Sequence, residues 1–528
     1  MRLKSFGVSM APRQNVFSHS RVRRSTSLRV APLLRNLSVL RITALRSILA
    51  TTLTALLFFG ASSCAVPIAP AYRIVKESRE VTFIPGPPPE LEIQARYVLQ
   101  NSGNRVLQFV DVIFPDAKLY GRTKLHAEVD GREAALSSLP AAYQEETPDA
   151  LRIAMDQPWL QKQTRALVIT YSFSSPEDLG SRITLGEASF HLGSRGWFPL
   201  PQPPKHMLAP YPRRPEKTSY SIRVPADFLL LARGRQVSRK QESGEVDYTF
   251  QLSNGDLAPY IVAGRYAEAA SHQKASRAAF WTLQPLTEDT AIAGERIAAA
   301  WVILQTDFGS LDKNIQVPHV VESPELRAHV TGETGAAFES FPGGVLVNRD
   351  ALALGISSEA FLAKTTHALA HNWFGDEMYP MRDAAVGIGE GLPDYATIVI
   401  DEARGGESAR RQRIIKFMQE YDDARKEAAE KPLAVTVLTD LPEQRRISLA
   451  KAPLFFAALE DECGESPIRG GLARIVSLLR GREVGYDDLR AALEQSTGKN
   501  LAETFRVWLN EKGIPANFRD RYSDRPEK

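Results

Sequence analysis

His367 and His371 are four residues apart, and this pair is the part of the sequence whose chemistry is easiest to infer. On a helix, residues at this spacing lie one turn apart on the same face, so both imidazoles can bind one metal ion. Glu390 follows His371 by 19 residues and can supply a third ligand from a second element. Two histidines, one carboxylate and an open fourth position are typical of a catalytic zinc site. The pattern predicts one Zn²⁺ bound by His367, His371 and Glu390.

The residues next to these ligands decide what such a site could do. Asp394 comes one helical turn after Glu390, where its carboxylate can accept the free N–H of a ligating histidine and fix its tautomer. Position 368, directly after the first histidine, is an alanine. In the HExxH pattern that position holds the glutamate that acts as general base. The sequence therefore predicts a complete metal cage without its catalytic base at Ala368.

The elements that must hold these residues differ between the two halves of the chain. A helix over 361–373 would carry both histidines, and a second helix would open at Glu390 after a glycine-rich turn. Residues 91–268 instead show short runs of β-branched and aromatic residues between turn residues. That pattern favours an antiparallel β-sandwich-like domain.

The length of 528 residues exceeds what one core supports, so we expect a multidomain protein. The expected parts are a basic region with a signal or anchor helix at 1–66, a Pro-rich tether at 67–90, the β-sandwich-like domain at 91–268, a mainly helical α+β domain of catalytic type at 269–520, and a charged tail at 521–528.

Composition is ordinary for a folded protein, with 43% hydrophobic and 24% charged residues. The formal net charge of +3 comes from residues 1–46, which carry ten Lys or Arg and no Asp or Glu. The remaining chain has 55 basic and 62 acidic residues and is mildly acidic. We therefore expect no nucleic-acid partner.

An apolar segment at 47–66 follows the basic residues and reads as an export signal or a membrane anchor. Its length of about 20 residues could just span a bilayer. Cys64 follows Ala-Ser-Ser and resembles a bacterial lipoprotein processing site, in which Cys64 would carry a lipid. Two other interpretations of the segment remain, an uncleaved membrane helix and a signal-peptidase site. We expect an exported protein of the bacterial cell envelope, attached to the membrane by this helix or by the lipid. Cys463 is expected to be a half-buried structural thiol.

Several motifs occur together in the order of one known family. The segment 367–375 (HALAHNWFG) resembles the family's HExxH-x-W-F-G signature, and Glu390 with the following glycine matches its downstream ligand glutamate. Residues 336–340 (AAFES) are similar to its Gly-Ala-Met-Glu-Asn motif, and Trp197-Phe-Pro resembles a loop of its N-terminal β-domain. On these motifs the chain resembles the zinc-dependent membrane-alanyl aminopeptidases, a gluzincin group, over most of its length beyond the N-terminal segment.

The resemblance implies a thermolysin-like domain at 269–520 and a peptide as ligand. The family's glutamate in the Gly-Ala-Met-Glu-Asn motif binds the free α-amine of the substrate, and the matching residue is Glu339. Ala336 and Ala337 occupy the preceding positions of the motif and are expected to belong to the same substrate-binding strand.

Two departures from the family pattern bear on activity. Ala368 replaces the general base, and residues 448–452 align with the family's Tyr-x-Lys-Gly so that Leu449 replaces the tyrosine that stabilises the oxyanion. A general base contributes about 10²–10⁴ in rate, and one oxyanion donor about 10²–10³. Losing both removes roughly 5–10 kcal/mol of transition-state stabilisation, although such effects do not add cleanly.

These observations lead to two main hypotheses. The first is a catalytically impaired peptidase homologue that keeps zinc and binds peptides or a protein partner. The second is an active zinc metallo-aminopeptidase that uses a non-standard base, for which Asp376 and Glu377 are the nearest carboxylates in sequence. A structural protein without metal is a third possibility, and the β-domain could itself be the binding module.

Overall fold

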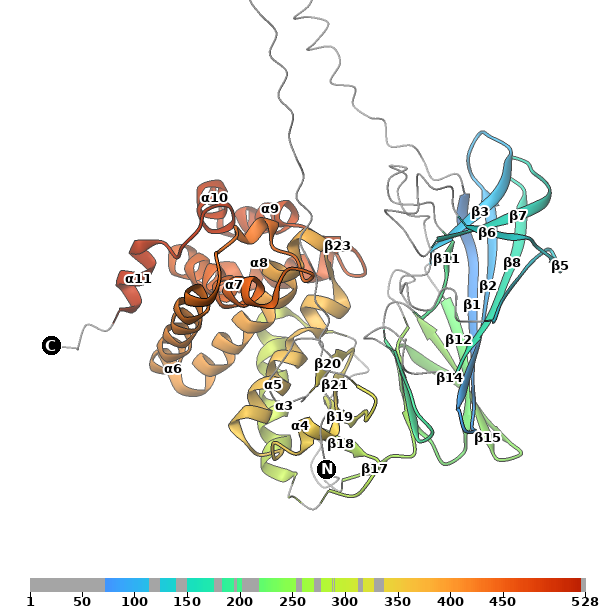
Figure 1. The fold of residues 1–528 in the computed structure, drawn as a ribbon, viewed down its shortest axis with the longest axis horizontal. Helices are drawn as coiled ribbons and strands as arrows, with labels where there is room; N and C mark the ends of the chain where they lie inside the picture. Colours follow the sequence, from blue (N-terminus) through green and yellow to red (C-terminus); the bar gives the residue numbers. More distant parts are fainter. Residues whose placement is uncertain are drawn as a thin grey trace, which may run out of the picture. The chain divides into compact units, whose positions relative to one another are not determined.

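Strands build the first half of the described chain, and helices dominate the second half (Figure 1). All described residues belong to one compact unit, Pro67–Lys528. This computed structural model describes residues 72–113, 124–138, 150–174, 183–193, 197–201, 218–252, 259–269, 277–286, 288, 290–311, 317–326 and 337–523. The apolar segment at 47–66, with Cys64, lies outside them. Within these described ranges, no helix has both the length and the apolar character that crossing a bilayer requires.

The largest sheet has eight strands in the order β14-β15-β12-β1-β2-β8-β4-β5. Along β2, buried side chains alternate with more exposed ones, which is the period-2 pattern of a sheet with one face on a core. The neighbouring strands β1 and β12 are parallel, so the prediction of an antiparallel β-sandwich-like domain is wrong at this pair. The bounds are β1 (Tyr72–Ile84), β2 (Glu90–Asn101), β4 (Lys124–Val129), β5 (Arg132–Glu133), β8 (Thr164–Phe173), β12 (Thr218–Pro225), β14 (Arg235–Glu242) and β15 (Glu245–Leu252).

The prediction of a Pro-rich tether at 67–90 is wrong for Tyr72–Ile84, because these residues form β1. Val81 and Phe83 face the core at 1% and 0% exposure, so this stretch gains its stability from burial. The prolines at 85–89 lie in the turn that joins β1 to β2. Prolines favour turns as well as linkers, and the sequence pattern does not separate the two.

Two four-stranded sheets complete the β region, in the orders β13-β16-β10-β9 and β11-β3-β7-β6. Their buried side chains form one hydrophobic core with those of the eight-stranded sheet, as in the stacked rings of Phe83 and Phe190, whose centroids are 5.3 Å apart. The bounds are β3 (Leu107–Ile113), β6 (Leu136–Ser138), β7 (Ala150–Trp159), β9 (Ile183–Leu185), β10 (Ser189–Leu192), β11 (Leu200–Pro201), β13 (Leu229–Ala232) and β16 (Ile261–Gly264).

A five-stranded mixed sheet opens the second half, in the order β17-β18-β19-β21-β20. The strands β18, β19 and β21 are parallel, whereas β17 and the edge strand β20 are antiparallel to their neighbours. Along the chain, α3 comes between β18 and β19, whereas α4 and α5 follow β21 (Figure 1). The bounds are β17 (Ala267–Glu268), β18 (Ala279–Thr282), α3 (Ala291–Phe308), β19 (His319–Glu322), β20 (Phe338–Phe341), β21 (Gly344–Val347), α4 (Arg349–Leu352) and α5 (Glu359–Ala370).

The rest of the described chain is helical apart from the short pair β22 (Tyr379–Pro380) and β23 (Glu483–Val484). The long element α6 consists of two helical stretches that meet at a kink, where Gly406 adopts φ 69° and ψ −166°. Residues 521 and 522 belong to α11, so the charged tail expected at 521–528 begins inside a helix. The bounds are η3 (Asn372–Glu377), η4 (Arg382–Ala384), η5 (Ala385–Glu390), α6 (Gly391–Glu427), η6 (Leu433–Val435), α7 (Pro442–Cys463), α8 (Glu465–Leu478), α9 (Tyr486–Thr497), α10 (Ala502–Asn510) and α11 (Ala516–Tyr522).

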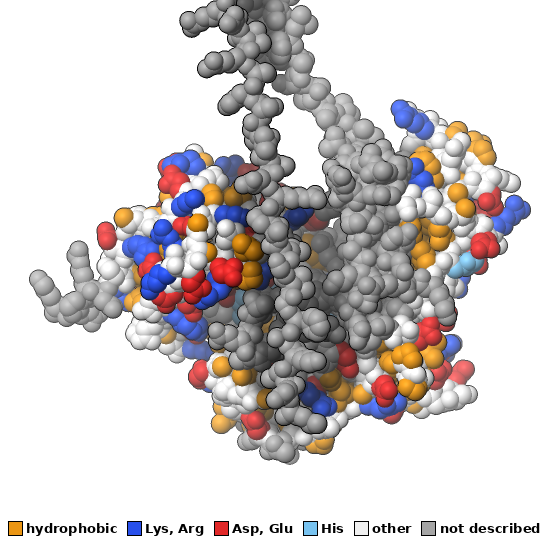
Figure 2. Space-filling view, in the orientation of Figure 1, with side chains coloured by type: hydrophobic (Ala, Val, Ile, Leu, Met, Phe, Trp, Pro, Cys, Tyr) orange, Lys and Arg blue, Asp and Glu red, His pale blue; other side chains and the backbone are white. Residues whose placement is uncertain are grey.

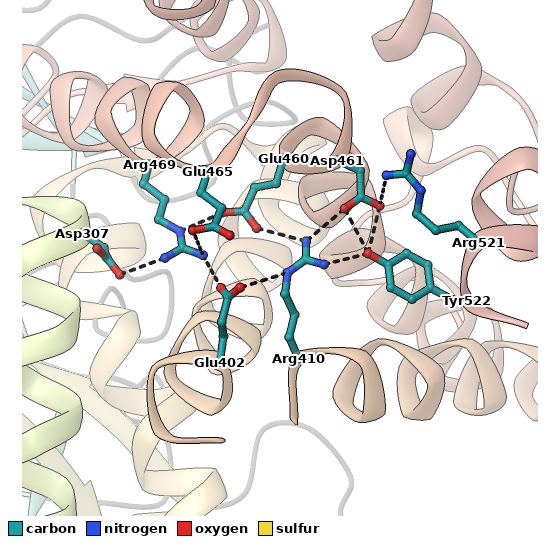
Figure 3. Close-up of polar contacts among 9 residues, drawn as sticks. All are labelled: Asp307, Glu402, Arg410, Glu460, Asp461, Glu465, Arg469, Arg521 and Tyr522. Carbon is teal, nitrogen blue, oxygen red and sulfur yellow. Dashed lines mark hydrogen bonds and ion pairs between the residues drawn. The ribbon is translucent and has the colours of Figure 1, made fainter. Parts of the chain in front are cut away.

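A network of charged side chains ties α6, α7, α8 and α11 to one another (Figure 3). Arg410 of α6 donates to Glu460 of α7 at 3.2 Å and to the hydroxyl of Tyr522 at 2.7 Å. Arg469 of α8 donates to the other oxygen of Glu460 at 2.7 Å. Buried ions need such pairing because an unpaired buried charge is costly. A pocket of about 520 Å³ borders this network and is not lined by the histidines.

Surface charges of both signs are mixed on the described part of the face shown in Figure 2. Lys and Arg side chains there alternate with Asp and Glu side chains and do not gather into a patch of one sign. This distribution agrees with the mildly acidic composition of the chain after residue 46.

Candidate metal centre

Helix α5 positions the two histidines. It begins after Ser358, whose hydroxyl accepts a hydrogen bond from the backbone N–H of Phe361 at 3.1 Å and caps the helix. Phe361 and Leu369 are fully buried and fix which face of α5 meets the core. His367 lies in the last turn, and His371 follows at the C-cap, before the wide turn η3.

The structure brings the three predicted ligands together. The Nε2 atoms of His367 and His371 are 3.1 Å apart, and one Glu390 oxygen lies 3.5 Å from each of them. The two imidazoles and the carboxylate retain 27%, 20% and 22% exposure, so the site is open to solvent on one side. The ligand atoms all lie within 4.8 Å of one another.

These separations suit one zinc ion. Tetrahedral ligands that each lie ~2.1 Å from zinc are ~3.4 Å from one another. The observed distances of 3.1 Å and 3.5 Å agree with that value. The donor set of two imidazoles and one carboxylate also matches the ligands that zinc prefers at sites with an open position.

Asp394 supports the histidine from the opposite ring nitrogen. Its Oδ1 lies 2.7 Å from Nδ1 of His367, which leaves Nε2 of that ring facing Glu390 and His371. Asp394 sits in the first turn of α6, one turn after Glu390, as the sequence predicted. A carboxylate in this position fixes the tautomer of a ligating imidazole and raises its basicity.

The electrostatics of the cluster follow from these contacts. Burial disfavours the charged form of His367, but the Asp394 and Glu390 carboxylates outweigh burial and raise the pKa of His367 to about 10. Burial likewise disfavours the charged form of Glu390, yet His371 and His367 hold the pKa of Glu390 well below its usual range. A metal ion that binds here therefore competes with a proton on His367.

Close packing by α7 fixes the position of Glu390. Glu390 ends the wide turn η5, and Gly391 begins α6. A Cβ atom on Gly391 would lie 2.6 Å from the Cβ of Ala452 in α7, closer than real contacts allow. A Cβ on Gly387 would overlap the hydroxyl of Tyr486. The glycine-rich turn is therefore required for close approach, which is one of the reasons proteins retain glycine.

The two positions that depart from the HExxH and Tyr-x-Lys-Gly patterns lie next to this centre. Ala368 is 3% exposed and packs in the helical core beside the first histidine. Leu449 is half-buried on α7 and lies one turn before Ala452, the residue that touches Gly391. Residues three apart share a helix face, so Leu449 points to the side of α7 that packs near Glu390. Neither side chain can donate or accept a proton.

Of the two carboxylates considered as substitute bases, Glu377 is held by arginine side chains. Glu377 accepts Nη2 of Arg233 at 2.5 Å, and its second oxygen lies 2.7 Å from Nε of Arg480. Glu377 is 2% exposed, and this double ion pair fixes the position of its carboxylate. Asp376 is also 2% exposed. These contacts hold the Glu377 carboxylate between Arg233 and Arg480.

Arg233 and Asn372 help to position the centre and were missed in the sequence. Arg233 belongs to the β region and donates a hydrogen bond to Glu377, which is the last residue of η3. Asn372, directly after His371, accepts the N–H of Gly343 at 2.6 Å and donates to the carbonyl of Gly344 at 3.3 Å. Asn372 is 0% exposed. The one feature of the sequence that could have pointed to its role is that it is a polar residue next to the apolar residues Trp373 and Phe374.

The proposed substrate-binding residues lie on or near the edge strand β20. Glu339 is half-buried on β20 opposite Leu346. The neighbouring Phe338 packs on Phe361 of α5, with ring centroids 5.6 Å apart, so this strand abuts the histidine helix. Ala337 is buried at 3% exposure, whereas Ala336 lies outside the described residues.

No protein-family model and no curated protein sequence matches this chain. Solved structures do resemble it. An M1 zinc metallopeptidase from Deinococcus radiodurans, in a variant with a glutamate replaced by alanine and bound to a Tyr-Ser-Ala substrate, has a TM-score of 0.58 at 17% identity and covers 84% of this chain and 95% of that one. The same metallopeptidase without that replacement has a TM-score of 0.56 at 16% identity, covering 84% and 95%.

A second similar structure is aminopeptidase A of Legionella pneumophila in complex with aspartic acid, with a TM-score of 0.58 at 17% identity. It covers 84% of this chain, which spans 50% of that longer protein. The protein therefore has the fold of M1 zinc metallopeptidases, with a sheet-rich N-terminal part and a mainly helical C-terminal part. At the level of the fold, the resemblance seen in the motifs is confirmed.

Proposed function

We propose that this protein is a zinc-binding homologue of the gluzincin aminopeptidases that binds peptides or a protein partner in the cell envelope without cleaving them efficiently. One observation carries the proposal. The three metal ligands and their supporting Asp394 converge within hydrogen-bonding distances, while the position that should hold the general base is the buried methyl group of Ala368.

A bound zinc ion polarises carbonyl oxygens and lowers the pKa of water. The residues of this chain would hold the ion and orient a ligand near it, but Ala368 cannot accept a proton and Leu449 cannot stabilise an oxyanion. The structure offers no ready replacement in Glu377, because Arg233 and Arg480 already bind both of its oxygens. This supports the impaired homologue over an active enzyme with a non-standard base.

A protein of this fold has been solved with a bound peptide. The Deinococcus radiodurans metallopeptidase was solved with the Tyr-Ser-Ala substrate in a variant with glutamate replaced by alanine. This protein has an alanine, Ala368, directly after its first histidine. We infer that peptides with a free N-terminus are its ligands, with Glu339 on β20 as the group that meets the α-amine.

The test measures zinc, binding and cleavage on the full-length protein. We expect about one zinc per chain by elemental analysis, binding of a short peptide such as Tyr-Ser-Ala, and little release of its N-terminal residue. The variants His367→Ala and His371→Ala should lose the metal. Rapid release of N-terminal residues by the native protein, abolished by a chelator, would overturn the proposal in favour of the active enzyme.

Restoration of the missing groups tests the same reasoning from the other side. Ala368→Glu combined with Leu449→Tyr should raise the rate of peptide cleavage by about 10⁴-fold or more, if the base and the oxyanion donor are what is lacking. Because Ala368 is buried, circular dichroism and zinc content must show that the variant is folded. A folded, zinc-loaded double variant without activity would show that further groups have been lost.

We also propose that residues 47–66 attach the protein to the membrane of the cell envelope, either as an uncleaved helix or through a lipid on Cys64. The apolar run after ten basic residues supports this placement. Mass spectrometry of the purified protein separates the two routes, because lipidation adds acyl mass to a chain that begins at Cys64. A chain recovered only from the soluble fraction would refute both.

A further inference from the structure

Three chain segments meet where the described structure begins. Tyr72, the first residue of β1, pairs with Asn101 at the end of β2. The turn after β7 joins them, because the N–H of Lys162 donates to the carbonyl of Asn101 at 2.9 Å. In return, the N–H of Asn101 donates to the carbonyl of Gln163 at 3.0 Å. This end of the β region is therefore one hydrogen-bonded block.

Buried side chains make the block rigid. Asn101 is 0% exposed, and its amide donates to the carbonyls of Arg105 at 2.8 Å and of Trp159 at 2.9 Å. The indole of Trp159 donates to the carbonyl of Gln163 at 2.8 Å and stacks on Tyr72 with centroids 5.8 Å apart. Such a fully satisfied network holds the two adjoining turns in one conformation.

Two apolar side chains project from this block into solvent. Val106 is 53% exposed and Leu160 is 48% exposed. They flank the paired residues Leu107 and Trp159 of β3 and β7, so they are neighbours across the end of the ladder. Single exposed apolar residues are ordinary. Val106 and Leu160, however, are neighbours on a rigid part of the β region, so their side chains cannot turn into the core and are suited to contact an apolar medium.

The surroundings of these two residues are basic. Arg73, Arg105 and Lys162 are exposed, and the segments 72–73, 101–106 and 160–163 contain no Asp or Glu. Apolar tips surrounded by cations suit the anionic surface of a phospholipid bilayer, where the tips enter the interface and the cations meet headgroup phosphates. We call Val106, Leu160, Arg73, Arg105 and Lys162 the β1-entry surface.

Chain length brings this surface near the membrane. Only residues 67–71 separate the apolar segment at 47–66 from Tyr72. Tyr72 lies six residues after position 66 and eight after Cys64, which corresponds to at most about 22 Å and about 29 Å when the chain is fully extended. A bilayer that holds the apolar segment, or a lipid on Cys64, therefore keeps the start of β1 close to its surface.

We propose that the β1-entry surface rests on the anionic membrane to which the N-terminal segment attaches, and so orients the whole peptide-binding unit relative to the bilayer. This inference rests on the membrane attachment proposed above. It adds a second, reversible contact to a covalent or helical anchor, and two such contacts hold a protein at a membrane more firmly than one.

Photocrosslinking in the full-length protein tests the contact. The photoreactive residue p-benzoylphenylalanine replaces Leu160 in one variant and Val237 in a matched control, because Val237 is 45% exposed on the edge strand β14. Both proteins are reconstituted into vesicles of phosphatidylethanolamine and phosphatidylglycerol, and lipid adducts are measured by mass spectrometry. We expect at least a tenfold higher lipid yield at position 160 than at 237.

Charge reversal gives an independent readout. Arg105→Glu together with Lys162→Glu should lower the lipid yield at position 160 several-fold, and replacing phosphatidylglycerol with phosphatidylcholine should do the same in the native sequence. Equal yields at 160 and 237 in protein that floats with the vesicles would overturn this inference alone, as would crosslinks from 160 mainly to a second protein chain. Protein that does not float would refute the attachment itself, and the inference with it.

Discussion

Removing the charge of Asp394 tests most directly whether the histidine cluster is a zinc site. Asp394→Asn keeps the size of the side chain, but its amide is a much poorer acceptor for the Nδ1–H of His367 than the carboxylate 2.7 Å away in the native protein. Loss of such a supporting carboxylate weakens metal binding by about 10–100-fold. That factor corresponds to ~1.4–2.7 kcal/mol of binding free energy. The magnitude is far too small to abolish the site and large enough to measure.

The assay is zinc competition against a chromophoric chelator at pH 7, with Asp401→Asn as the matched control. Asp401 lies on the same helix α6 and forms an ion pair with Arg413 at 2.6 Å. Its loss should alter zinc affinity by less than about twofold, because it supports no ligand. Unchanged zinc affinity in Asp394→Asn, or an equal loss of zinc affinity in both variants, would refute the role of Asp394 in supporting His367. Either result would also count against the assignment of the histidine cluster as a zinc site.

Two further predictions follow from packing around the centre. Glu377→Gln leaves Arg233 and Arg480 without their carboxylate partner. Because Arg233 is 3% exposed, the free energy of unfolding should fall by about 3–5 kcal/mol. An unchanged urea unfolding midpoint would contradict this prediction. Gly391→Ala forces a methyl group to within 2.6 Å of Ala452, so we expect a loss of about 1–3 kcal/mol in stability. The same Gly391→Ala change should also weaken zinc binding, because Glu390 is the adjoining residue. A variant with native stability and native zinc affinity would show that α7 can shift to make room for the methyl group.

The sequence alone located the candidate metal ligands of this protein. A spacing of four residues places two side chains on one face of any helix, so the His367–His371 pair needed no knowledge of the rest of the chain. The same local rule placed Asp394 one turn after Glu390. The division into a sheet-rich first half and a mainly helical second half followed from local residue patterns as well. Local patterns failed where a residue type has two uses, as with the prolines at 85–89, which form a turn after a strand.

Contacts between distant segments could not be read in this way. The sequence predicted Glu390 as a ligand, but it did not predict that α7 packs closely on the adjoining Gly391. The ion pair of Arg233 with Glu377 joins residues 144 positions apart, and no local pattern predicts it. The parallel pairing of β1 with β12 likewise depends on how the chain returns after β11.

The absence of a base at position 368 was thus fixed by the sequence, because it concerns which atoms the chain carries. Whether another carboxylate could replace it depended on where folding places each acidic side chain, and that is set by the pairing of buried charges across the tertiary structure. Residue identity limits what chemistry is possible, whereas long-range packing decides which of the remaining groups can reach the metal centre.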